Sequence, residues 1–468
     1  MTNRRCRHLR LVLVLVAALN PAANTAPAQR PLRIRPSHID SVVETHRAEY
    51  HVPSVALFIG TIGGRGLYEK TYGTAQVAPP IPTNTRSLFL LASVSKPYAA
   101  VTAHRLAEAG RIDLAAPIRR YLPSLPGWGD SVSVRQILAH SSGILDFTDV
   151  SGWNDTARAD SYIRLALASP LRFRPGTRFE YSNTNYALLE QIIERVTGES
   201  YAATAAKLVL APLGLSQTHF DCPSSWATDL ARGYRLGPGG NIVAVPRPGR
   251  DHYPDATAGL CASAADVARF FSSILSGRLL GPQSVEDLHT ADGGDPEDTR
   301  FGAGLGVTHE TTGDVWSHSG GFPGANTEVA IWPKDSLVIV VLTNSGGGEA
   351  EHLNRNIARS VFGMTPVADL PVADLSVAAD VSGSYAGRYN TSDGRLFVGE
   401  RDGHVFVFGQ RCYNQGGDVF ICDPDKSRTV RFVRDSTGVR EAWLYIEGVR
   451  RLRGRRAQPQ EPVSFRPP

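Results

Sequence analysis

The stretch Leu91-Ala-Ser-Val-Ser-Lys-Pro-Tyr98 contains the only Ser-x-x-Lys pattern in this 468-residue chain. Only five of the 49 basic residues are lysine, and the other 44 are arginine. An arginine stays protonated, whereas burial and neighbouring charge can make a lysine give up its proton. A neutral Lys96 one helical turn from the hydroxyl of Ser93 is a base beside a nucleophile, which is the arrangement that activates serine for acyl transfer.

A helix is expected from Ser93 to about Ala109, where Gly110 ends it. Residues three apart share a helix face, so Ser93 and Lys96 should point the same way. The helix N-terminus also favours negative charge near the serine. Taken alone, the pattern is a weak signal whose alternative is a capping serine and a surface lysine, so other motifs must support the chemistry.

A second motif, Tyr181-Ser-Asn183, precedes a helix expected from Tyr186 to Val196 and therefore belongs on a loop at a cleft rim. Tyr181 beside an ammonium can act as a phenolate or relay a proton from nucleophile to leaving group. Asn183 can donate to a substrate amide carbonyl. Taken alone, this motif fits a simple helix entry.

A third motif, His318-Ser-Gly-Gly321, precedes a strand expected at Glu328 to Trp332. Gly320 and Gly321 would let a substrate lie against a strand edge. The backbone N–H groups of Gly321 and Ser93 would form an oxyanion hole, and His318 and Ser319 could receive a substrate carboxylate. The alternative is a glycine-rich turn.

The sequence of residues 29–363 predicts an α/β (α+β) fold. Hairpins at both ends of this segment, Ser54 to Tyr68 and Glu328 to Leu342, can pair into one antiparallel sheet. Between them lies a mostly helical stretch, which predicts an inserted helical lobe. Three capping patterns mark helix starts: Ser37-x-x-Asp40, Ser133-x-x-Gln136 and Ser263-x-x-Asp266.

The end of the chain contains only strand signals, at 395–399, 404–408, 429–434 and 442–446, which predict a small all-β domain. Basic residues before an apolar run from Leu11 to Leu19 predict a cleaved signal peptide and hence a periplasmic or secreted protein. The predicted organisation is a signal peptide (1–28), a catalytic domain (29–363), a linker (364–382), an antiparallel β-domain (383–456) and a disordered tail (457–468).

Composition limits the partners. Cleavage after Ala28 would leave 45 basic and 45 acidic residues, and this neutrality argues against nucleic acid. The apolar run is too short for a stable membrane span. No spacing resembles a metal site, so neither a metal nor another cofactor is expected.

Four cysteines remain after cleavage of the signal peptide. Cys222 with Cys261 and Cys412 with Cys422 are possible disulfides, with free buried thiols as the alternative.

The three motifs in this order resemble the serine β-lactamase and penicillin-binding protein superfamily, whose signature is S-x-x-K, Y-x-N and K-T-G or H-x-G. The resemblance covers about residues 38 to 362 and implies a β-lactamase/transpeptidase-like fold. It also implies that Ser93 is acylated, Lys96 takes or positions its proton, Tyr181 relays protons and Asn183 holds the acyl side chain. The Ser93 and Gly321 amides would bind the oxyanion.

The tyrosine in the second motif resembles the branch of class C β-lactamases, D-alanyl-D-alanine carboxypeptidases, D-aminopeptidases and esterases. Efficient class C enzymes have lysine where this chain has His318, which argues against strong lactamase activity. The function expected is therefore a hydrolase acting on D-amino-acid peptides, small esters or, weakly, β-lactams. The alternative is a penicillin-binding or peptidoglycan-sensing protein with little turnover. A third alternative, a conventional Ser-His-Asp hydrolase, is disfavoured because this sequence contains no G-x-S-x-G nucleophile elbow. His140 is interpreted as structural.

Overall fold

The computed structural model describes residues 29–364, Pro366 and residues 384–456, apart from short loops and turns. The undescribed loops are 154–157, 221, 223–228, 238–240, 247–252, 291–299 and 311, and the undescribed turns are 392–393, 402–403, 408–409, 415–417, 423–427, 436–437 and 447–448. The predicted signal peptide, most of the predicted linker and the predicted tail lie outside the described residues.

The helices and helical turns are α1 (Pro36–Glu49), η1 (Ala92–Val94), α2 (Ser95–Glu108), η2 (Ile118–Arg120), η3 (Gly127–Asp130), α3 (Val134–Leu138), η4 (Phe147–Asp149), α4 (Ala159–Ala168), α5 (Asn183–Thr197), α6 (Tyr201–Ala205), η5 (Ala206–Leu210), α7 (Ala211–Leu213), α8 (Asp255–Ala258), α9 (Ala264–Leu275), α10 (Pro282–His289), η8 (Pro333–Asp335) and α11 (Ala350–Val361). The strands before residue 364 are β1 (Ser54–Thr61), β2 (Gly66–Gln76), β3 (Ile81–Pro82), β4 (Phe89–Leu90), β5 (Thr218–Phe220), β6 (Tyr234–Leu236), β7 (Ile242–Ala244), β8 (Leu260–Ala262), β9 (Arg300–Phe301), β10 (Gly306–Glu310), β11 (Gly313–Phe322), β12 (Ala325–Trp332) and β13 (Leu337–Thr343). The strands after it are β14 (Gly387–Thr391), β15 (Gly394–Arg401), β16 (His404–Val407), β17 (Gln410–Asn414), β18 (Val419–Ile421), β19 (Arg428–Asp435), β20 (Gly438–Ile446) and β21 (Val449–Arg456).

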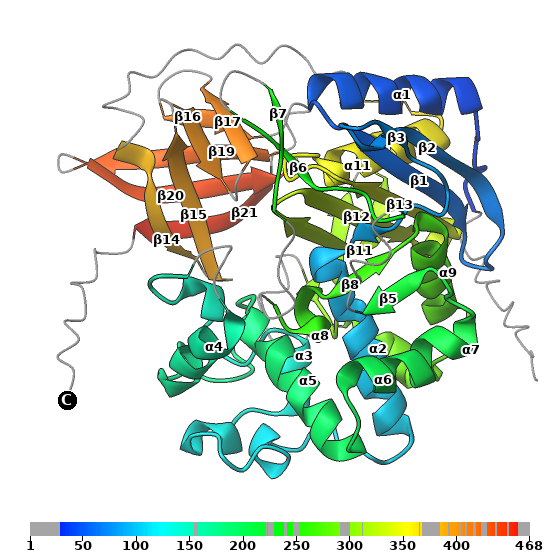
Figure 1. The fold of residues 1–468 in the computed structure, drawn as a ribbon. Helices are drawn as coiled ribbons and strands as arrows, with labels where there is room; N and C mark the ends of the chain where they lie inside the picture. Colours follow the sequence, from blue (N-terminus) through cyan, green and yellow to red (C-terminus); the bar gives the residue numbers. More distant parts are fainter. Residues whose placement is uncertain are drawn as a thin grey trace, which may run out of the picture.

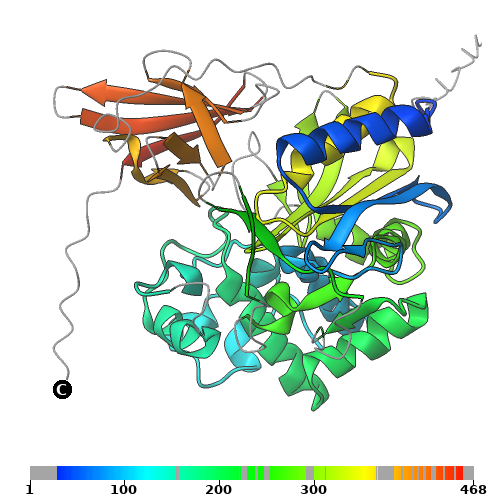
Figure 2. The ribbon, with the colours of Figure 1, turned by 45° about the horizontal axis from the view of Figure 1, so that its top comes forward.

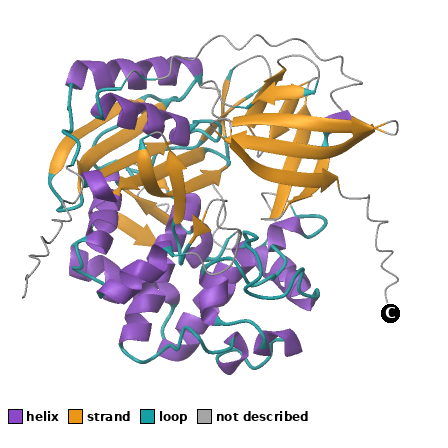
Figure 3. Ribbon diagram, turned by 180° about the vertical axis from the view of Figure 1, so that it is seen from behind, coloured by secondary structure: helices purple, strands orange, loops and turns teal. Residues whose placement is uncertain are grey.

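An antiparallel sheet of eight strands lies at the centre of the larger part of the chain, in the order β3-β2-β1-β13-β12-β11-β10-β9. The pairing of β1 with β13 joins the first and last hairpins, as the sequence predicts. Helices α1 and α11 cover one face of the sheet, while α2, α9 and the helical lobe lie on the other (Figure 1). The view from behind shows the same layers (Figure 3).

Strand β13 shows why the sheet is covered on both sides, because all seven of its residues are buried. Ile339 and Val341 pack into the cluster formed with α1 and α11. Val338 and Val340 belong to the cluster formed with α2 and α9. Successive side chains of a strand point to opposite faces, so a continuous apolar run requires a cover on each side.

The predicted start of the nucleophile helix is wrong by two residues. Ser93 lies in the short 3₁₀ turn η1, and α2 begins at Ser95. The helix does end where predicted, with Ala109 as its C-cap and Gly110 at φ +69°. Ser93 therefore precedes the first turn of α2.

The capping pattern predicted at Ser37 is also wrong. Arg35 is the N-cap of α1, and no side chain caps this end. Asp40 instead accepts hydrogen bonds from the hydroxyls of Tyr68 and Tyr72 on β2. This carboxylate ties α1 to the sheet, which a local pattern cannot reveal.

Strands β14 to β21 form a closed antiparallel barrel, a strand-only body that follows the sheet-and-helix part (Figure 2). β14 closes the barrel on β21 by pairing Tyr389 with Arg456. The sequence predicted β15, β16, β19 and β20 and missed β14, β17, β18 and β21. Tyr389, Phe420 and Phe432 lie among the buried residues of the barrel core.

Both cysteine pairs form disulfides. Cys222 bonds to Cys261 on β8, and Cys412 on β17 bonds to Cys422 just after β18. Within the described residues no helix is both long and apolar enough to cross a bilayer. In the same part of the chain, no three His, Cys, Asp or Glu side chains gather as a metal site would require.

The capping box at α3 makes a stability prediction. Ser133 Oγ accepts from the Gln136 N–H at 3.2 Å, and Gln136 Oε1 accepts from the Ser133 N–H at 2.9 Å. The substitution Ser133→Ala should lower the free energy of unfolding by about 1 kcal/mol, measured by urea denaturation. Ser161→Ala, at an exposed site on α4, should change it by less than about 0.5 kcal/mol. Equal effects of the two substitutions would contradict the structure.

Candidate active site

Ser93 lies in a strained turn that its neighbours hold in place. Ala92, just before it, has φ +48°, a left-handed conformation that non-glycine residues rarely adopt. The Leu91 N–H donates to the Leu260 carbonyl at 2.9 Å. The Leu91 carbonyl accepts from Thr327 Oγ1 on β12 at 3.0 Å. The strain is thus balanced by contacts from the sheet and from β8, which fix the serine just before the start of α2.

Lys96 is fully buried, in the first turn of α2. Its Nζ lies 3.1 Å from Ser93 Oγ, 2.9 Å from Asn183 Oδ1 and 3.0 Å from the carbonyl oxygen of Thr257 on α8. Burial lowers the pKa of Lys96 to about 7, and the charge of Asp146 acts in the opposite direction. A large share of the lysine is therefore neutral at physiological pH.

The three contacts of Lys96 determine where a neutral amine points. A neutral amine has two hydrogens and one lone pair, and the oxygens of Asn183 and Thr257 can act here only as acceptors. They take both hydrogens, which leaves the lone pair for Ser93. The Ser93 hydroxyl then donates to Lys96 Nζ, which is the contact that a base needs to activate a serine.

Tyr181 lies over this pair. Lys96 Nζ is 5.0 Å from the centre of its ring. Burial raises the pKa of Tyr181 well above its usual value, although a hydrogen bond with Ser93 lowers it. The phenol therefore stays protonated, which favours the proton-relay role over the phenolate role.

Asn183 begins α5 and is bonded at both ends of its amide. Its Oδ1 accepts from Lys96, and its Nδ2 donates to Asp146 Oδ2 at 3.0 Å. The predicted site did not include Asp146. No local pattern marks it, because its contact with Asn183 spans 37 positions.

The third motif lies within strand β11, and is not a turn. A Cβ atom on Gly320 would come within 2.3 Å of the Leu91 carbonyl oxygen and 2.4 Å of Thr327 Oγ1. Glycine at 320 therefore lets the strand approach the Ser93 turn. Gly321 faces open space, with nothing within 4 Å of a Cβ built there.

Among the described strands, the second half of β11, from His318 to Phe322, is paired with β12 on one side and with no strand on the other. β10 pairs with Gly313 to Ser317 and stops there, while the motif that begins at His318 continues along β12. Such an edge can take an extended substrate as an added strand. Ser319 is exposed, on the opposite face of β11 from His318 and Gly320.

His318 lacks the positive charge with which a histidine would bind a substrate carboxylate. It is 5% exposed, and its Nδ1 lies 2.7 Å from the Ser319 carbonyl oxygen, so Nδ1 carries the hydrogen. Burial and the nearby charge of Lys96 lower the pKa of His318 to about 3. The ring is therefore neutral, and its Nε2 is a buried acceptor without a partner among the described atoms.

His140 has a structural place beside Tyr181. The two rings stack with centres 4.2 Å apart, and His140 Nδ1 accepts from the Ser182 N–H at 3.1 Å. Burial, with the nearby Lys96 and His318, lowers the pKa of His140 well below its usual range. With Nδ1 engaged by backbone, His140 supports the Tyr181 loop and is not arranged as the histidine of a Ser-His-Asp triad.

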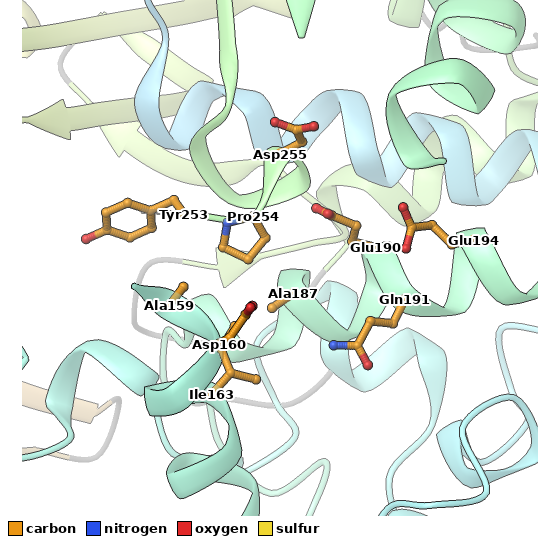
Figure 4. Close-up of a pocket in the computed structure, with 10 residues that line it drawn as sticks. All are labelled: Ala159, Asp160, Ile163, Ala187, Glu190, Gln191, Glu194, Tyr253, Pro254 and Asp255. Carbon is orange, nitrogen blue, oxygen red and sulfur yellow. The ribbon is translucent and has the colours of Figure 1, made fainter. Parts of the chain in front are cut away.

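A separate cavity of about 350 Å³ lies between α4, α5 and the start of α8 (Figure 4). It contains none of the predicted site residues. Four carboxylic acids line it, namely Asp160, Glu190, Glu194 and Asp255. Burial raises the pKa of Glu190 to about 8, and its Oε2 accepts from the Ala256 N–H.

Comparison with known proteins identifies the family of this chain. The family model described as Beta-lactamase matches residues 39–362, which is more than half of the chain. The chain therefore belongs to the beta-lactamase family.

A curated relative extends the comparison. Protein flp from Staphylococcus aureus (strain MRSA252) is 27% identical over 333 residues, which are 68% of this chain and 66% of that protein. The chain thus spans just under two thirds of the length of this curated relative.

Solved structures confirm the predicted β-lactamase/transpeptidase-like fold. The octameric penicillin-binding protein homologue from Pyrococcus abyssi matches with a TM-score of 0.65 and 23% identity, over 90% of this chain and 100% of that one. A D-amino acid amidase from Ochrobactrum anthropi SV3 matches with a TM-score of 0.58 and 22% identity, over 69% of this chain and 96% of that one.

Gly320 offers a test of the packing around Ser93. Gly320→Ala should displace the Leu91 carbonyl or Thr327, lower the free energy of unfolding by about 1–3 kcal/mol and reduce the acylation rate of Ser93 by about tenfold or more. Gly321→Ala is the matched control for stability, because its Cβ meets open space. Unfolding and fluorophosphonate labelling measure the two effects. Unchanged stability and labelling in Gly320→Ala would show that β11 does not support the turn.

The pKa of Lys96 predicts a pH dependence. Lys96 can accept a proton only when neutral, so acylation of Ser93 should rise with pH through an apparent pKa of about 7. Below it the rate should fall about tenfold per pH unit. The rate of fluorophosphonate labelling as a function of pH measures this limb. A labelling rate that rises only through the ordinary lysine pKa of 10.5 would contradict the assignment.

Proposed function

We propose that this chain is an exported serine hydrolase that acts through a covalent acyl-enzyme on amide, ester or lactam carbonyls. Its substrates would be D-amino-acid peptides or small esters, with weak activity on β-lactams. The observation that carries the proposal is the set of three contacts made by Lys96, which leaves the lone pair of a neutral amine for Ser93. A serine beside such a base is an activated nucleophile.

The proposed reaction has two steps. Ser93 Oγ attacks the carbonyl carbon while its proton passes to Lys96 Nζ, and the N–H groups of Ser93 and Gly321 hold the oxyanion. The leaving group departs with a proton delivered through the neutral phenol of Tyr181. Water then attacks the acyl-enzyme, gives a proton back along the same groups and releases the acid, which restores Ser93.

The substrate class is inferred from His318. Its buried neutral ring offers a lone pair and no positive charge, so it does not attract a substrate carboxylate. Penicillins and peptides with a free C-terminus carry a carboxylate, whereas amides and small esters do not, so amides and esters rank first among the proposed substrates and peptides with a free C-terminus rank below them. The family resemblance and the D-amino acid amidase fold support the same choice.

Export is inferred from two features. The N-terminal pattern of arginines before a short apolar run is typical of a signal peptide. The disulfides Cys222–Cys261 and Cys412–Cys422 fit an oxidising compartment.

Intact-protein mass spectrometry tests the proposal directly. The protein is incubated separately with p-nitrophenyl acetate, D-phenylalanine amide and a fluorescent penicillin. We expect turnover of the ester or the amide and a slower, longer-lived penicillin adduct on Ser93. Ser93→Ala should abolish adduct and turnover, and Lys96→Arg should lower kcat by about 100-fold or more, because charge is kept and proton transfer is lost.

Two controls accompany these substitutions. Lys207→Arg changes a lysine that is 70% exposed, and Ser161→Ala changes an exposed serine, so neither should alter the rate. Activity retained by Ser93→Ala would refute the proposal. A stable adduct with no turnover of any probe would instead indicate a penicillin-binding or sensing protein.

A further inference from the structure

We infer that Asp146 is a positioning residue that directs the lone pair of Lys96 at Ser93 by fixing the side-chain amide of Asn183. This inference rests on the proposed function and adds a residue that lies outside the three motifs. It concerns the orientation of one amide, which decides whether Lys96 has two acceptors or one.

The amide of Asn183 can occupy its place in two orientations of nearly the same shape. In one, Oδ1 faces Lys96 and Nδ2 faces Asp146, at 2.9 Å and 3.0 Å. In the other, an NH₂ group would face the Lys96 amine, and a carbonyl oxygen would face the Asp146 carboxylate. The contact between the carbonyl oxygen and the Asp146 carboxylate would be repulsive, and the NH₂ group would repel a charged Lys96 or occupy the lone pair of a neutral one, which Ser93 needs. Asp146 thereby selects the orientation that gives Lys96 its second acceptor.

Asp146 is itself held firmly. It is 9% exposed, and its Oδ1 accepts from the Thr148 N–H at 3.0 Å, as the N-cap of η4. Thr184, next to Asn183 on α5, clamps the same loop, because its Oγ1 accepts from the Phe147 N–H at 2.9 Å and donates to the Leu145 carbonyl at 2.7 Å. The carboxylate and the amide are thus fixed to one another through the start of α5.

Asp146 also acts on Lys96 by charge. Both carboxyl oxygens accept hydrogen bonds, which is the pattern of an ionised group. Burial raises the pKa of Asp146, while the Thr148 and Asn183 hydrogen bonds lower it. Its negative charge raises the pKa of Lys96 against the effect of burial. Among the described residues, titratable groups near Lys96 also include those of His140, Tyr181, Tyr186 and His318.

Two substitutions separate the charge of Asp146 from its hydrogen bond. Asp146→Asn removes the charge and keeps one oxygen, which can accept from Asn183 if the new NH₂ group takes the place of the acceptor for the Thr148 N–H. The acid limb of kcat/KM should then move to lower pH by roughly half to one unit, with kcat changed by less than about threefold. Asp146→Ala removes the acceptor, so kcat should fall by about tenfold or more while KM changes little. Asp149→Asn, in the same turn, is the matched control and should leave the limb in place.

The limb is measured both by ester hydrolysis and by fluorophosphonate labelling of Ser93. Labelling reports nucleophilic attack by Ser93 even if no ester is turned over, so failure of the proposed function and failure of this inference are distinguishable. An unmoved acid limb in Asp146→Asn, or a wild-type kcat in Asp146→Ala, would overturn the role of Asp146. If Asp146→Ala does not fold, as judged by thermal unfolding, the sign of the shift in Asp146→Asn decides.

Discussion

Lys96 has no contact with solvent, and a lysine in such a place persists only if the surrounding chain supplies its hydrogen-bond partners. Those partners come from three separate segments: η1, the start of α5 and α8. Because removing the ammonium from water is unfavourable, burial lowers the pKa of Lys96 to about 7. The fold therefore uses the free energy of burial to hold a base at neutral pH beside Ser93.

The sheet is what brings these segments together. Strand β11 can approach the Ser93 turn because Gly320 has no side chain, and Thr327 on β12 binds the Leu91 carbonyl beyond it. The unusual backbone at Ala92 persists because these contacts hold it. The site is therefore a product of the sheet, the helical lobe and the turn between them, and not of the Ser-x-x-Lys pattern alone.

The sequence predicted the features that local chemistry determines. The two hairpins that join in one sheet, the end of α2 at Gly110 and the side-chain caps at Ser133 and Ser263 are all present. What it missed depends on contacts far apart in the chain. Asp40 binds two tyrosines of β2 instead of capping a helix, and half of the barrel strands have no clear apolar alternation of their own.

The same limit applies to the site. Ser93, Lys96, Tyr181 and Asn183 could be proposed from motifs because residue type and spacing carry their chemistry. Asp146 and the carbonyl of Thr257 could not be proposed in this way. Every residue has a carbonyl, and Asp146 contacts a residue that is 37 positions away in the chain. The neutral state of His318 also follows from burial, which its motif does not encode.

Direct titration of Lys96 tests this account most simply. The chain has five lysines, so a lysine-labelled protein gives few side-chain signals in an NMR spectrum, and Lys96→Arg assigns the one that matters. The account predicts that the Lys96 signal shifts with a pKa of about 7. A Lys96 that stays charged until pH reaches the ordinary lysine value of 10.5 would contradict it, since no base would then be available to Ser93 at neutral pH.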